Sequence, residues 1–64
     1  MDVAQWYMQV IGYYVRGAAE MLRVLSVRPS VRLVMRRQRY LRSAMYYTRE
    51  WLALLESSPY AHLV

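Results

Sequence analysis

The chain has 64 residues, with no cysteine, no phenylalanine and no lysine, and one histidine, His62. The lack of cysteine excludes disulfides, thiolate zinc sites and thiol nucleophiles, and a single histidine excludes a His-based metal site within one chain. A chain of this size buries only about 60% of its unfolded surface, so without disulfides or metals it needs partners. Residues 1–64 are therefore predicted to be one small helical subunit without independent domains.

Acidic residues are also scarce. The sequence contains four acidic residues and nine basic residues, all nine of them arginine, and the formal net charge is +5. Guanidinium forms forked bonds to phosphate and carboxylate and tolerates interfaces better than ammonium does. The charge favours an anionic partner: nucleic acid, acidic lipid or an acidic protein face. Codon bias in a GC-rich genome explains arginine without lysine equally well.

The residues that catalysis requires are few. A hydrolytic or acid–base site needs a nucleophile or base held by a second group. Ser57, Ser58 and His62 are close in sequence, but they lie near a chain end, where side chains are poorly held in register. Gly12 and Gly17 lie inside a helical pattern and form no phosphate-binding loop. We expect no enzymatic activity, no cofactor and no small-molecule substrate.

Long hydrophobic runs are missing as well. The longest uncharged run covers residues 3–15, whereas a bilayer span needs about 20 predominantly apolar residues. A spanning helix would have to include Arg16 and Glu20. No secretory signal is expected, because Asp2 stands where a basic region should be.

The first helical pattern covers about residues 2–27. Its polar residues recur every three or four positions and form one narrow stripe: Asp2, Gln5, Gln9, Arg16, Glu20 and Arg23. The remaining circumference is apolar or aromatic, which is more than one neighbouring helix can cover. The residues expected to pack in this segment are Trp6, Tyr7, Ile11, Tyr14 and Leu22.

The second helical pattern covers about residues 31–57 and is amphipathic. Its expected packing residues are Leu41, Met45, Trp51 and Leu52. The opposite face carries arginines that we expect to contact an anionic partner or lipid phosphates, although a solvated surface is the plainer interpretation: Arg32, Arg36, Arg39, Arg42 and Arg49. Arg37 falls among the apolar positions and should need an acceptor there.

Pro29 separates the two patterns, because proline pushes the preceding residue out of the helical region. The sequence thus predicts an all-α fold of two helices, as a helical hairpin or a bent rod, with an extended tail from Pro59. A hairpin would set Trp6 level with Trp51. It would also set Glu20 level with Arg37, which makes these two a candidate buried ion pair.

The chain is similar in general character to the small supernumerary subunits of mitochondrial assemblies, which are short, arginine-rich and helical. We therefore expect a non-catalytic structural subunit of a large inner-membrane complex, of the respiratory-chain or ATP-synthase kind. It would lie in the inner membrane or at its matrix face, packing on larger subunits and on cardiolipin. The alternative is an RNA-contacting accessory protein of the mitochondrial ribosome, in which Tyr40, Tyr46 and Tyr47 offer stacking surfaces. A membrane-active peptide is disfavoured by Glu20 and Glu50.

Overall fold

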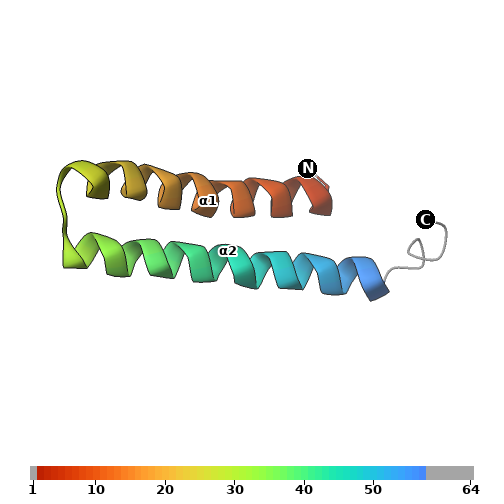
Figure 1. Cartoon of the computed structure of the whole chain (residues 1–64). Coiled ribbons are helices and arrows are strands. Elements are labelled where there is room, and N and C mark those ends of the chain that lie inside the picture. The colour runs from red at the N-terminus through yellow and green to blue at the C-terminus, as the bar shows by residue number, and fades with distance from the viewer. Residues whose placement is uncertain (1, 58–64) are drawn as a thin grey trace.

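The computed structural model describes residues 2–57, which form two antiparallel helices (Figure 1). Helix α1 covers Val3–Val27 and helix α2 covers Val31–Ser57. The all-α prediction and both sets of helix bounds are confirmed, and the chain forms a hairpin instead of a bent rod. The expected tail from Pro59 lies outside the described residues.

Local capping explains where α1 begins and ends. The side chain of Asp2 accepts a hydrogen bond from the backbone N–H of Gln5 at 2.7 Å, which satisfies a donor that the helix leaves free. The helix ends because Arg28, which precedes proline, is extended at φ −139° and ψ 100°. The Arg28 N–H still donates to the carbonyl of Val24 at 2.8 Å.

Helix α2 begins directly after the turn. The hydroxyl of Ser30 accepts from the N–H of Leu33 at 3.3 Å, and its carbonyl accepts from the N–H of Val34 at 3.0 Å. No residue from 2 to 57 has a positive φ angle. Extended Arg28, Pro29 and the Ser30 cap therefore reverse the chain without the glycine that a tight turn usually needs.

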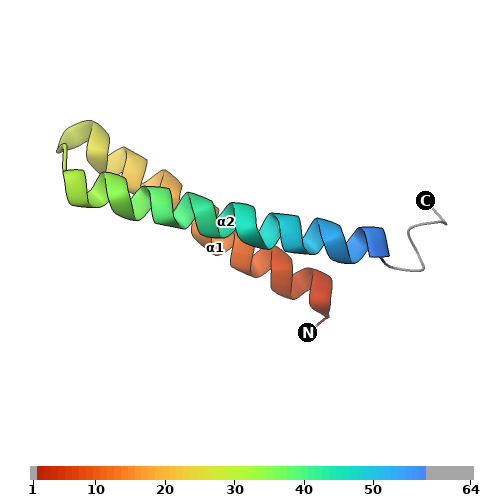
Figure 2. The same ribbon diagram turned by 90° about the horizontal axis from the view of Figure 1, so that it is seen from below.

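The two helices meet along residues spaced alternately by three and four positions, which is a heptad pattern. Every one of these residues is buried or half-buried. We call this row the seam, and its members are Ala4, Tyr7, Ile11, Tyr14, Ala18, Met21 and Leu25 of α1 and Leu33, Arg37, Tyr40, Ala44, Tyr47 and Trp51 of α2. The helices cross at a shallow angle (Figure 2), as seams of this period require.

Aromatic rings fill the seam toward the open end of the hairpin. Tyr14 stacks on Tyr47 at a centroid distance of 5.9 Å, and Tyr7 meets Trp51 at 5.1 Å. Gly17 makes room for the ring of Tyr40, since a Cβ atom on it would lie 2.5 Å from Tyr40 Cε2. The glycine is therefore required by close approach and not by an unusual backbone angle.

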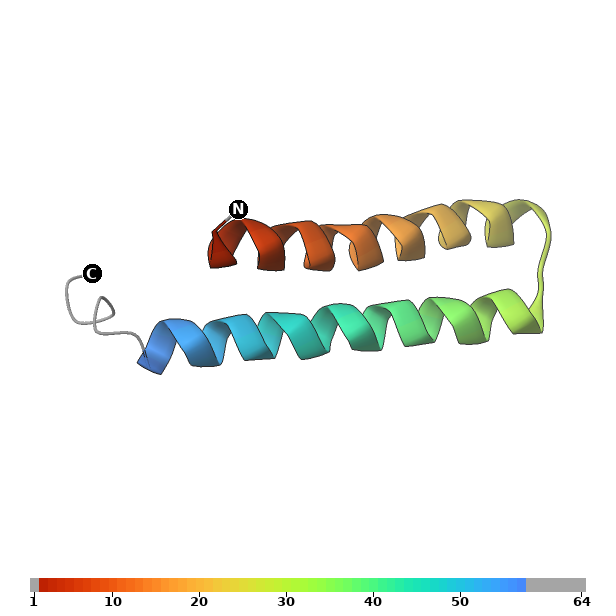
Figure 3. The same ribbon diagram turned by 180° about the vertical axis from the view of Figure 1, so that it is seen from behind.

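A single pair of helices leaves most of each helix uncovered. Of residues 2–57, three hydrophobic residues are buried, namely Tyr7, Ala18 and Ala44. The hairpin measures 48 × 18 × 17 Å, and α2 extends past the start of α1 at the open end (Figure 3). Many large apolar side chains consequently face outward.

Candidate anion-binding site

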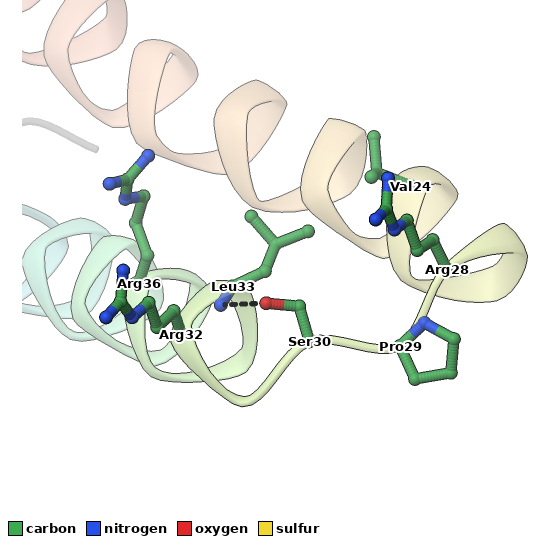
Figure 4. Close-up of a pocket in the computed structure, with 7 residues that line it drawn as sticks. All are labelled: Val24, Arg28, Pro29, Ser30, Arg32, Leu33 and Arg36. Atoms are coloured by element: carbon green, nitrogen blue, oxygen red, sulfur yellow. Dashed lines mark hydrogen bonds between the residues drawn. The ribbon is translucent and has the colours of Figure 1, made fainter.

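The turn end of the hairpin carries a concave surface lined with arginine. The pocket encloses about 560 Å³ and is open to solvent. Arg32 and Arg36 project from the same side of α2, one helical turn apart, and Arg28 lies beside Val24 at the end of α1 (Figure 4). Ser30 and Leu33 complete the wall that α2 supplies. We call this the turn pocket.

The electrostatics of the turn pocket favour an anion. Three of the residues that line it are arginines and none carries a carboxylate. The N-terminus of α2 at Ser30 adds the positive end of a helix dipole. Glu20 lies on the neighbouring surface but pairs with Arg23, at 3.6 Å. Guanidinium binds phosphate oxygens in pairs, so a phosphate group suits this pocket chemically.

The predicted arginine face divides into parts with different surroundings. All five of its arginines are exposed. Arg32 and Arg36 line the turn pocket together with Arg28, which the sequence did not single out. Arg49 instead borders an apolar groove with Val15 and Leu41. Arg39 and Arg42 line neither. The signal for Arg28 was its position next to the chain reversal, which brings it level with the first turn of α2.

The expected ion pair between Glu20 and Arg37 does not form, and its prediction was wrong. Glu20 lies on the polar stripe of α1, opposite the seam, and its side chain is 64% exposed beside Arg23. Arg37 lies in the seam, where its Nε donates to the carbonyl of Ala18 at 3.2 Å. A side chain on the far side of α1 cannot reach the seam, so a backbone carbonyl is the acceptor that Arg37 uses.

A second polar contact joins the helices at the open end. The hydroxyl of Tyr7 donates to Glu50 Oε1 at 2.8 Å. Burial and then this hydrogen bond raise the pKa of Tyr7 above its usual value, and a hydrogen bond with Glu50 also raises the pKa of Tyr46. A hydrogen bond with Tyr40 raises the pKa of Tyr13. The protonated form of all three tyrosines is therefore favoured, and Tyr7 acts as a donor between the helices.

The hairpin has two unlike broad faces. On one, Met8, Val15 and Leu22 recur every seven residues along α1, and α2 adds apolar side chains at the matching height. Val15, Leu41, Met45 and Thr48 line a groove of about 490 Å³, which Arg49 borders at its edge, and none of the residues that make up the face itself is charged. We call this the charge-free face, and it consists of Met8, Val15, Leu22, Val34, Leu41, Met45, Thr48 and Leu52.

The opposite broad face carries aromatic rings and arginines. Trp6 meets Tyr47 at a centroid distance of 5.8 Å, and Tyr13 stacks near Tyr40 at 6.0 Å. Trp6 is 43% exposed and Tyr13 is 58% exposed. Helical spacing places Arg32 and Arg36 on this same side. We call it the aromatic–arginine face.

The predicted packing residues separate into two groups. Tyr7, Ile11, Tyr14 and Trp51 lie in the seam between the helices. The others lie on the broad faces: Trp6 on the aromatic–arginine face, and Leu22, Leu41, Met45 and Leu52 on the charge-free face. Leu22, Met45 and Leu52 are 51–53% exposed. For these three, an interface with another molecule stays a prediction.

Two further properties concern only residues 2–57. Neither helix there is both long and apolar enough to span a bilayer. In the same part of the chain, no three side chains from histidine, cysteine, aspartate and glutamate gather into a group that could hold a metal ion.

Comparisons of this chain with protein-family models, with curated proteins and with solved structures found no match.

Proposed function

We propose that this chain is a non-catalytic structural subunit of a large membrane-associated complex, of the kind found in the mitochondrial inner membrane. In this proposal the hairpin packs on larger subunits, and its turn pocket holds the phosphate of an anionic lipid such as cardiolipin. No step of chemistry is assigned to the chain.

The exposure of apolar surface is the observation that carries this proposal. Three buried residues are a small core for 56 described residues, and contiguous exposed apolar patches generally mark interfaces. In the single hairpin, large apolar side chains face solvent: Met8 is 70% exposed and Val31 is 77% exposed. A hairpin with so much uncovered apolar surface is stabilised best within a larger assembly.

The turn pocket supports the lipid part of the proposal. Basic pockets near a membrane bind anionic lipid head groups, each nearby arginine contributing about 1 kcal/mol. Arg28, Arg32 and Arg36 provide three such charges at one end of the molecule. The mitochondrial setting depends on the likeness in general character to small supernumerary subunits, namely a short, arginine-rich, helical chain.

Co-migration on a native gel tests the proposal. Membranes from cells that express a tagged chain would be extracted with mild detergent and separated without denaturant, and partners would be identified by mass spectrometry. We expect the chain in a high-mass membrane complex that survives high salt. Recovery of the chain only as a small free species would contradict the proposal.

One feature favours a second candidate function, an RNA-contacting accessory protein of the mitochondrial ribosome. Trp6, Tyr13 and Tyr46 are 43–62% exposed, and the first two share a face with Arg32 and Arg36. Exposed rings beside arginines can stack with unpaired bases.

The dependence of binding on salt concentration distinguishes the two candidate functions. Neutralising phosphates releases counterions, so the affinity of a ribosomal contact falls steeply as salt rises. A chain that follows ribosomal RNA at low salt and dissociates at high salt would favour the ribosomal role. A chain that stays with the detergent-extracted fraction throughout would favour the membrane complex.

A further inference from the structure

The charge-free face has the size and composition of a protein interface. Six of its side chains are 42–70% exposed: Met8, Val15, Leu22, Val34, Met45 and Leu52. Together they present on the order of 500 Å² of apolar surface, which approaches the ~800 Å² that each partner buries in a standard interface. The rims of the same face would add to that area.

Hydroxyl groups on and beside this face would not oppose its burial. Thr48 Oγ1 donates to the carbonyl of Ala44 at 2.7 Å, and Ser26 Oγ donates to the carbonyl of Arg23 at 2.6 Å. Both donors are thus already paired within their own helices. Removing water from the face leaves no hydroxyl donor unsatisfied, which is the usual cost of burying polar atoms.

Charge is distributed unevenly along the hairpin. Residues 16–42, the turn half, contain eight arginines and one carboxylate, Glu20, for a net charge of +7. Residues 2–15 and 43–57, the open half, contain Arg49 against Asp2, Glu50 and Glu56, for a net charge of −2. The two halves together give the formal charge of +5. The net charges of the turn half and the open half are therefore opposite in sign.

We propose that the charge-free face binds a second copy of this chain, with the two hairpins antiparallel and their turns at opposite ends. This arrangement keeps the two cationic turn halves apart and sets each beside the open half of the other copy, whose net charge is negative. A parallel pair would bring together two turn halves of +7 each. The pair would form a four-helix bundle. Each hairpin is one layer of it, and the two charge-free faces form the apolar core between the layers.

The pairing leaves other surfaces available. The turn pocket and the aromatic–arginine face stay on the outside of the bundle, where a larger subunit or a lipid could bind. The inference goes beyond the proposed function and does not rest on it, because it concerns the purified chain alone.

Sedimentation equilibrium of the purified chain tests whether a pair forms. We expect a reversible dimer at micromolar concentrations. Val15→Glu places a charge at the centre of the charge-free face and should weaken the dimer by roughly 100-fold, as expected for an unpaired charge buried at an interface. Met35→Glu is the matched control, since Met35 is 54% exposed on the outer side of α2, and it should leave the dimer unchanged. Circular dichroism verifies that both variants remain helical.

Engineered cysteines test the orientation, because the natural chain contains none. Val34→Cys lies near the turn on the charge-free face, and Leu52→Cys lies near the open end. An antiparallel pair should form disulfides efficiently when the two variants are mixed and poorly when either is alone. Efficient cross-linking of each variant with itself would overturn the antiparallel arrangement.

The remaining outcomes are also decisive. A folded monomer at all concentrations would overturn the second copy as the occupant. If Val15→Glu then removed the chain from a high-mass complex, the face would belong to a larger subunit and the proposed function would stand. If the dimer formed but no high-mass complex were found in cells, the pairing would stand and the proposed function would fail.

Discussion

The open half and the turn half of this hairpin use different chemistry along the same seam. In the open half, Tyr7, Tyr14, Tyr47 and Trp51 meet as rings between the helices. In the turn half, Arg37 enters the seam and donates to a backbone carbonyl, and the surrounding surface is densely cationic. Aromatic contacts stabilise a fold, while exposed arginines add little stability and much attraction for anions. Aromatic packing is therefore concentrated at the open end and cationic surface at the turn end.

Removing a ring from the open half should have the largest effect. Trp51→Ala deletes the ring that lies against Tyr7, and we expect a loss of about 2–4 kcal/mol in the free energy of unfolding. A core this small supplies only about 3–5 kcal/mol, so the variant should be largely unfolded. Thermal melts followed by circular dichroism, at one fixed chain concentration, measure the loss. Met35→Ala on the outer side of α2 should change stability by less than about 0.5 kcal/mol.

Neutralising the turn pocket should affect binding without affecting the fold. Replacing Arg28, Arg32 and Arg36 together with glutamine should weaken binding to cardiolipin-containing vesicles by about 3 kcal/mol, which is roughly 100-fold. The thermal melt should hardly move, because these side chains are exposed.

Vesicle co-sedimentation measures that binding. The control removes the same charge elsewhere, with glutamine at Arg16, Arg39 and Arg42, and should lose clearly less affinity. Equal losses in the two triple variants would mean that net charge, and not the turn pocket, determines lipid binding.

The two glycines of α1 should respond to alanine with opposite signs. Gly17→Ala places a methyl group against Tyr40, whose ring is held by Tyr13 and Tyr14. Overpacking of this kind costs about 1–3 kcal/mol and should exceed the gain in helix propensity. Gly12→Ala meets only the exposed side chain of Arg16, which can move, and should gain up to ~1 kcal/mol. Urea titrations give both values, and stabilisation by Gly17→Ala would show that the helices are not this close.

Alkaline pH should have the smallest effect on stability, and it should act by deprotonating tyrosines. The pKa values of Tyr7, Tyr13 and Tyr46 are raised in the folded chain. Their contribution to stability is therefore fully present below the ordinary tyrosine pKa of 10.0, and it is lost as pH rises above that value through the raised pKa values of the folded chain. We expect a lower melting temperature at about pH 11 than at about pH 8. The chain has no lysine to titrate in this range, and phenylalanine at these three positions should reduce the difference.

Local signals made the helix bounds predictable from the sequence. Pro29 separates the two helices where expected, and the caps that the structure shows at Asp2 and Ser30 also act through their nearest neighbours. The choice between a hairpin and a bent rod was not predictable in this way. It depends on contacts between residues far apart in the sequence, from 19 positions for Arg37 with Ala18 to 43 positions for Tyr7 with Glu50.

The faces of α2 were predicted less well than its bounds. Hydrophobicity alone centred its packing face near Met45, whereas the seam runs through Tyr40, Ala44 and Tyr47. Tyrosine and alanine are less hydrophobic than leucine and methionine, so a reading by hydrophobicity underweights the seam. The alternating spacing of Tyr40, Ala44 and Tyr47, by four and three positions, was the stronger signal. Arg37 belongs to that spacing, which explains why it interrupted the apolar pattern.

The most direct test of the account is the oxidation rate of Met8 and Met45 in the native assembly. Both side chains lie on the charge-free face, 70% and 53% exposed in the single chain, and a second copy or a larger subunit would shield them. Hydroxyl-radical labelling in cells, followed by mass spectrometry, compares their rates with those of the denatured chain. We expect strong protection of both methionines. Oxidation as fast as in the denatured chain would contradict this expectation.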